Sequence, residues 1–278
     1  MRKHILYPLI ALLLGVCGAF SYRKLLSGAV DGLPVPGDPS AMILIALCAV
    51  AGVLFLFFAW KSRGMQGGAL YTMPCTIRAG LLIGCAAGLM FSAMLHLKTV
   101  MDVYEMGASL LSCILELVLV VLAIPTMVAA AFLAKDAKAG SGRSHNSLTV
   151  LFPVLYGWFW LIDVYRRHSA NPVLGDYLFL MLAVIFLLLA AFGRSGFSFG
   201  DGKPRFTVFT CLCALFFATI SLVSFFDLPT LFTTMGMMFY TAATLTALLR
   251  DLPMPEFPDP ELESDSELEL ETEVSDDE

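Results

Sequence analysis

Eight long apolar runs constrain the fold of this chain more than any other feature of its sequence. A helix that crosses the hydrocarbon core of a bilayer needs about 20 mostly apolar residues, and about 17 to 25 are acceptable. Eight segments meet this requirement: 5–22, 41–60, 79–97, 107–134, 148–164, 177–193, 206–226 and 228–249. Because 58% of the residues are hydrophobic and only 14% are charged, a soluble domain could not bury this much apolar surface. The sequence therefore predicts an all-α, polytopic membrane helical bundle.

The first run has a second interpretation. Residues 1–21 combine a basic start, an apolar middle and small residues near the end, which is also the plan of a cleaved signal peptide. The end of this run has a counterpart at the end of the fifth run, and this favours a retained span. Cleavage of residues 1–21 stays open as the alternative.

The Lys and Arg residues are spread unevenly over the connections between the runs. With the N-terminus in the cytoplasm, twelve of them lie on the cytoplasmic side and five on the outer side. Cytoplasmic connections of membrane proteins carry an excess of these residues, and an even number of spans leaves both termini on the same side. We therefore expect a multi-pass protein of a cell membrane, which we take to be a bacterial plasma membrane, with both termini in the cytoplasm.

Short motifs recur in the same order in the two halves of the chain. Segments 21–39 and 164–177 both contain Tyr-Arg-base, then Ser and Ala, then Pro-Val, then Gly-Asp. The second and sixth runs also end alike, as do the fourth and eighth. This order predicts two four-helix membrane halves, 1–134 and 148–250, joined by a flexible basic cytoplasmic linker at 135–147. Since four is even, the halves would form a parallel pseudo-repeat.

The net charge of −6 averages two unlike parts of the chain. Residues 1–250 carry a net +7, whereas residues 251–278 carry thirteen acids and no base. Few apolar residues and dense like charge oppose packing, so we expect this acidic tail to be disordered in the cytoplasm. Its role is either solubility and repulsion from anionic lipid, or docking on basic loops of this protein or of a basic protein partner.

Five bases are predicted to gather at the outer face of the membrane: Arg23, Lys24, Arg166, Arg167 and His168. In the simpler interpretation they belong to two corners of the fold, where an adjacent Tyr lies at the headgroup level and the bases reach toward phosphates. In the alternative they form a positive outer mouth that attracts an anionic solute or a lipid headgroup.

Glu116 is the one acid well inside an apolar run. An ionised acid near the bilayer centre costs about 2.5–3.5 kcal/mol on insertion scales, so we expect Glu116 to be protonated, paired or beside a wet cavity. His96 is its most plausible partner. Glu116 is then either a coupling or substrate-contacting carboxylate, or a neutral group that makes one interhelical hydrogen bond. Asp163 precedes Arg167 by four residues, which is the spacing of a helical ion pair.

Small residues recur every four positions in the third run, at Gly80, Gly84, Gly88 and Ser92. Such a stripe allows another helix to approach closely, and we expect it to pack within the chain in preference to forming a dimer. The seven cysteines include no CxxC pair, which favours buried free thiols over a metal site.

No catalytic motif is visible in the sequence, so we predict neither an enzyme nor a cofactor, and no nucleic-acid partner. The leading hypothesis is a permease-like protein in the lipid bilayer that handles a small amphiphilic solute or a lipid. The alternative is a membrane scaffold or sensor that acts through its acidic tail.

Overall fold

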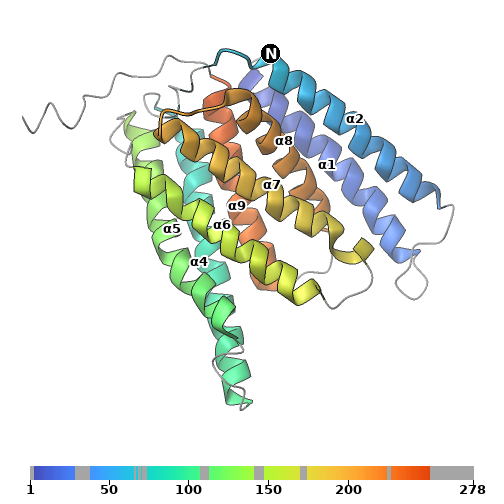
Figure 1. Ribbon diagram of the computed structural model, residues 1–278, viewed down its shortest axis with the longest axis vertical. Coiled ribbons are helices and arrows are strands. Elements are labelled where there is room, and N and C mark those ends of the chain that lie inside the picture. The colour runs from blue at the N-terminus through green and yellow to red at the C-terminus, as the bar shows by residue number, and fades with distance from the viewer. Residues whose placement is uncertain are drawn as a thin grey trace, which may run out of the picture.

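The computed structural model describes residues 3–28, 38–65, 67, 70, 74–106, 113–140, 147–169, 174–223 and 227–250. In these ranges the chain forms helices α1 (Lys3–Ser27), α2 (Pro39–Lys61), α4 (Thr76–Glu105), α5 (Ile114–Ala139), α6 (Ser147–His168), α7 (Leu174–Ser198), α8 (Pro204–Ser221) and α9 (Leu228–Leu248), as Figure 1 shows. All eight are long and apolar enough to cross a membrane. The predicted multi-pass helical membrane protein is confirmed.

The helix ends differ most from the sequence prediction at α4 and α5. The run 79–97 lies within a helix of 30 residues, because polar residues can continue the backbone hydrogen bonds of a helix beyond its apolar part. Helix α5 continues to Ala139 and ends at Gly140, whose φ of +68° is the left-handed conformation that closes many helices. Residues 135–139, the start of the predicted linker, are therefore helical.

Several helix starts follow from local sequence. The side chain of Asp38 accepts a hydrogen bond of 2.8 Å from the backbone N–H of Ser40, which caps α2. Pro39 and Pro204 occupy the first positions of α2 and α8. Proline is favoured there because the first N–H groups of a helix have no intrahelical acceptor.

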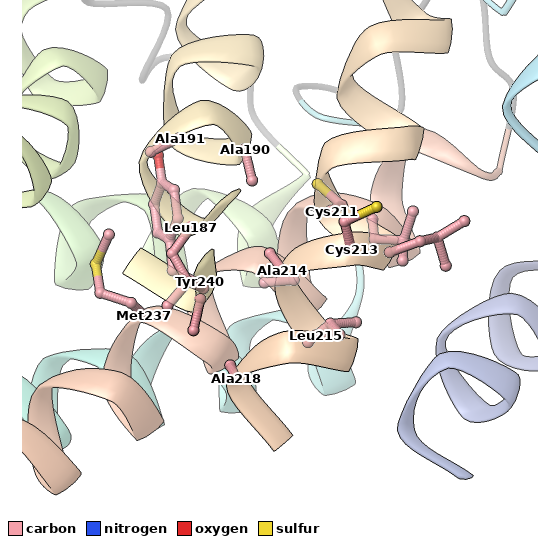
Figure 2. Close-up of a cluster of buried hydrophobic side chains, with 14 of the residues drawn as sticks. Leu187, Ala190, Ala191, Cys211, Cys213, Ala214, Leu215, Ala218, Met237 and Tyr240 are labelled. Atoms are coloured by element: carbon pink, nitrogen blue, oxygen red, sulfur yellow. The ribbon is translucent and has the colours of Figure 1, made fainter. Parts of the chain in front are cut away.

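Helices α7, α8 and α9 form the centre of the bundle. Figure 2 shows side chains from all three helices meeting in the core, among them Leu187 of α7, Ala214 of α8 and Tyr240 of α9. Alanine and cysteine side chains such as Ala190 and Cys211 fill little space, so the helix backbones can approach closely here. Most of α8 is buried, whereas most of α2 faces outward.

The first four spans lie on two sides of this centre. Helices α1 and α2 pack on each other and on α8, while α4 and α5 pack on each other and on α9 and α6 (Figure 1). Among the described helices, the first four therefore flank the second four as two hairpins. The environments of the corner tyrosines also differ: Tyr22 is buried, whereas Tyr165 is 62% exposed. The parallel pseudo-repeat stays a prediction.

The bundle has two ends, which we name by the chain termini. At the terminal face α1 begins and α9 ends, and at the far face α6 ends while α5 and α9 begin (Figure 1). The charge count in the connections predicts that the terminal face is cytoplasmic. The acidic tail, 251–278, lies outside the described residues.

Candidate functional site

Four charged side chains meet at the far face, and we call them the charged cluster: Glu116, Asp163, Arg167 and Asp227. Arg167, in the last turn of α6, binds a carboxylate from each of three elements. Its Nη2 lies 2.7 Å from Oδ2 of Asp163 and 3.4 Å from Oε1 of Glu116, at the start of α5. Its Nη1 lies 3.4 Å from Oδ2 of Asp227, the N-cap residue of α9. One guanidinium therefore links α5, α6 and α9.

The acids of the charged cluster differ in how far they are exposed. The side chain of Asp227 is 46% exposed, that of Glu116 is 13% exposed, and that of Asp163 is 2% exposed. The three carboxylates together carry more negative charge than Arg167 neutralises when all are ionised. One buried oxygen of Asp163 and one of Glu116 also lack a hydrogen-bond partner among the described residues. Buried acceptors without a donor are costly, so these oxygens favour a further hydrogen-bond donor.

His96 of α4 is buried, and charges of the charged cluster act on its ring. It is 2% exposed, and neither ring nitrogen has a hydrogen-bond partner in the described part of the chain. The charges of Arg167, Asp163 and Asp227 all act on the His96 ring. The predicted pairing of His96 with Glu116 is replaced by the pair between Glu116 and Arg167. The end of α6 packs beside α5, which the sequence pattern of either helix alone does not reveal.

A buried polar network lies deeper in the bundle, formed by Ser92, Tyr156 and Thr233. The hydroxyl oxygens of Ser92 and Thr233 are 2.5 Å apart, and those of Tyr156 and Thr233 are 3.1 Å apart. Ser92 donates to the carbonyl oxygen of Pro229 over 3.0 Å. Since each hydroxyl has one proton, Thr233 then donates to Ser92, and Tyr156 donates to Thr233. The network has a single consistent donor order, from α6 through α9 to α4.

Polar side chains on one face of α6 connect the charged cluster to the polar network. Tyr156, Trp160, Asp163 and Arg167 follow at spacings of four, three and four residues, so they line one stripe of the helix. The indole N–H of Trp160, between the two groups, is buried and has no acceptor among the described residues. From Tyr156 to Arg167 the stripe extends for about 16 Å at 1.5 Å per residue. That is about half of the hydrocarbon thickness of a bilayer.

The small-residue stripe of α4 brings this network together. A Cβ atom on Gly88 would lie 3.0 Å from Cα of Gly236, and one on Gly84 would lie 3.1 Å from the ring of Phe239. Both neighbours belong to α9, so the stripe packs within the chain and carries Ser92 to Thr233. Gly80, the fourth member, has open space around it.

The five predicted outer bases divide between the ends of α1 and α6. Arg23 and Lys24 are exposed on α1, which packs on α2, α8 and α9. Arg166 is exposed, and the ring of His168 stacks on Tyr177 of α7 with centroids 5.2 Å apart. Arg167 turns toward the three acids.

Sequence reasoning missed Asp227, Tyr156 and Thr233, and it assigned Asp163 only an ion pair with Arg167 within one helix. The helical spacing of polar residues along α6 is the signal that points to Tyr156. Asp227 gives no such signal, because it lies in a connection. Arg194 belongs to none of the predicted sites, but it is buried in α7 and donates to Thr244 over 3.0 Å. Its Cζ lies 4.9 Å from the ring centroid of Tyr240.

No group of three or more His, Cys, Asp or Glu residues in the described ranges is arranged to share a metal ion. No protein-family model, no curated protein and no solved structure matches this chain.

Proposed function

We propose that this chain is a permease-like protein that handles a small amphiphilic solute or a lipid, and that the charged cluster takes up and releases a proton during its cycle. The observation that carries the proposal is the acid excess around Arg167: three carboxylates from three elements share one guanidinium. The polar residues of the spans are few, which fits an amphiphilic cargo better than a strongly hydrated ion.

The charged cluster is suited to hold the far face closed. With Glu116 and Asp227 ionised, Arg167 ties the starts of α5 and α9 to the end of α6. A protonated carboxylic acid attracts a guanidinium much less than a carboxylate does. Protonation of Glu116 therefore weakens the link between α5 and α6, and the far face can open between these helices. Asp163, Arg166 and Asp227 are the other charges that act on Glu116.

The buried groups below the charged cluster extend the path for a proton. His96 can accept a proton at one ring nitrogen and donate one from the other, and neither nitrogen is engaged by a protein group among the described residues. The hydroxyls of Tyr156, Thr233 and Ser92 can pass a proton along their hydrogen bonds. These groups favour a proton as the coupled species, since a relay needs donors and acceptors in sequence and no wide channel.

The proposal is tested with the full chain in proteoliposomes. A panel of fluorescent amphiphiles and short-chain fluorescent phospholipids is followed across the bilayer, with and without a pH gradient. We expect the protein to accelerate at least one compound and the gradient to change that rate. Glu116→Gln should abolish the effect of the gradient, while Glu105→Gln, an exposed acid at the same face, should retain it. Movement of no compound, or an unchanged response in Glu116→Gln, would contradict the proposal.

The second candidate function is a scaffold or sensor that acts through the acidic tail. It is favoured by the thirteen acids of residues 251–278, which give the tail a strong attraction for basic groups. If the chain is a scaffold or sensor, removal of residues 252–278 should abolish binding of a basic partner, whereas Glu116→Gln should leave that binding unchanged.

A further inference from the structure

A pocket of about 850 Å³ opens at the terminal face, where α2 and α7 end and α8 begins. Its lining combines two kinds of group. Lys203 and Arg205 supply two exposed positive charges, and Met65, Phe197 and Phe206 supply apolar walls. Neither cation forms an ion pair with a described residue. The ion pairs among the described residues all involve Arg167, which lies at the far face. Asp201 is a neighbour in sequence but does not line the pocket.

The last helix ends beside this pocket. A Cβ atom on Gly67 would lie 2.8 Å from the ring of Phe197 and 3.4 Å from the side chain of Leu248. Gly67 therefore lies between Phe197, which lines the pocket, and Leu248, the last residue of α9. The segment from Leu248 to Phe257 can extend to about 30 Å at 3.3 Å per residue, so the first part of the tail can reach into the pocket.

The first part of the tail complements the pocket. Residues 254–263, MPEFPDPELE, contain one aromatic residue, Phe257, with Glu256 before it and Asp259 two positions after it. Prolines at 255, 258 and 260 restrict the backbone, so less conformational entropy is lost when this segment is held in one place. An aromatic side chain between two acids matches apolar walls beside two bases.

We propose that this pocket binds residues 254–263 of the same chain, with Phe257 between the apolar walls and Glu256 and Asp259 against Lys203 and Arg205. The tether makes binding intramolecular, so individually weak contacts suffice at the effective concentration of about a millimolar that a short linker provides. The docked tail connects the ends of α2 and α7 and the start of α8. This inference does not depend on the proposed transport function.

A lipid headgroup and a second copy of the chain are the competing occupants. An anionic headgroup matches Lys203 and Arg205 but leaves the aromatic walls unused. The tail of another copy has the same chemistry but lacks the tether. The experiment distinguishes all three.

The test uses the full-length protein in lipid nanodiscs, with p-benzoyl-phenylalanine in place of Phe257. After illumination, mass spectrometry should find adducts within one chain on Met65, Phe197 or Phe206. The charge reversal Lys203→Glu with Arg205→Glu should lower the adduct yield by about tenfold at low salt, because two attractive charge pairs become repulsive. Adding Glu256→Lys and Asp259→Lys to that variant should restore the yield. Salt at about 0.5 M should lower the yield of the unaltered pocket, since exposed charges are then screened.

Lys135→Glu with Lys138→Glu is the matched control, because it reverses two exposed charges on the end of α5 at the same face. It should leave the yield unchanged. Adducts only with lipid, adducts between two chains, or an equal yield in the Lys203→Glu/Arg205→Glu protein would each overturn the proposal. If the protein with both charge reversals does not fold, the single variants Lys203→Gln and Arg205→Gln replace it, and each should lower the adduct yield.

Discussion

Arg167 and Glu116 form an ion pair between α6 and α5, with Nη2 and Oε1 3.4 Å apart. Both side chains are partly buried, so the pair is screened less than a surface pair. The same guanidinium binds Asp163 and Asp227, which makes Arg167 the common member of every ion pair found among the described residues. The coupling energy of each of these ion pairs can therefore be measured in a double-mutant cycle that includes a substitution of Arg167.

The coupling between Glu116 and Arg167 should be measurable in a double-mutant cycle. We expect Glu116→Gln and Arg167→Gln to be non-additive by about 0.5–1 kcal/mol in the free energy of unfolding, because the pair is only partly buried. Thermal or denaturant unfolding of the protein in detergent gives the values. The same cycle with Glu105→Gln in place of Glu116→Gln should show additive effects, and coupling there would mean that the effect is not specific to the pair.

Asp163 is the most buried member of the charged cluster and makes its shortest contact with Arg167, 2.7 Å. Asp163→Ala should lower the free energy of unfolding by about 1–3 kcal/mol, which is the range for a buried polar group that loses its partner, here the guanidinium of Arg167. Asp201→Ala removes an exposed acid from the other end of the bundle and should change stability by less than about 0.5 kcal/mol. Equal effects of the two substitutions would contradict the structural role of Asp163.

The close approach of α4 and α9 predicts opposite effects for two glycines of the same stripe. Gly88→Ala puts a methyl group against the backbone of Gly236, so we expect a loss of about 1–3 kcal/mol from overpacking. Gly80→Ala meets no neighbour within 4 Å and should be neutral or stabilising, because alanine favours a helix over glycine. Unfolding of both variants in detergent decides this. A larger loss for Gly80→Ala would show that the stripe packs differently.

Tyr156→Phe removes the hydroxyl that donates to Thr233. We expect a loss of about 0.6 kcal/mol, the average for an interhelical hydrogen bond in a membrane protein. Tyr165→Phe is the matched control on the same helix, since that ring is 62% exposed and its hydroxyl makes no hydrogen bond with a described residue. If the two variants unfold alike, the hydroxyl of Tyr156 does not contribute through the polar network.

The charge distribution predicts that the terminal face is cytoplasmic. Alkaline phosphatase fused after Ser169, at the far face, should be active in intact bacterial cells, because the enzyme folds only outside the cytoplasm. The same fusion after Gly140, at the terminal face, should be inactive. The reverse pattern would invert the orientation and place the charged cluster on the cytoplasmic side.

The number and approximate position of the spans were predictable, because hydropathy is a local property that each segment carries by itself. The packing stripe at Gly84, Gly88 and Ser92 was also predictable, since small side chains spaced four residues apart lie on one side of one helix. The helix ends were predicted less well. Polar residues such as those at the end of α4 continue a helix without changing the apolar pattern that reveals it.

The partners of individual polar residues depended on the fold. Glu116 was expected beside His96, but Arg167 is its partner because α6 packs against α5. Asp227 joins them from a connection that has no periodic pattern at all. Likewise, the hairpins α1/α2 and α4/α5 lie on opposite sides of the central helices, although they follow each other in the chain. Hydrophobic burial acts on each segment separately, whereas ion pairs depend on which helices become neighbours, and that emerges only when all eight pack together.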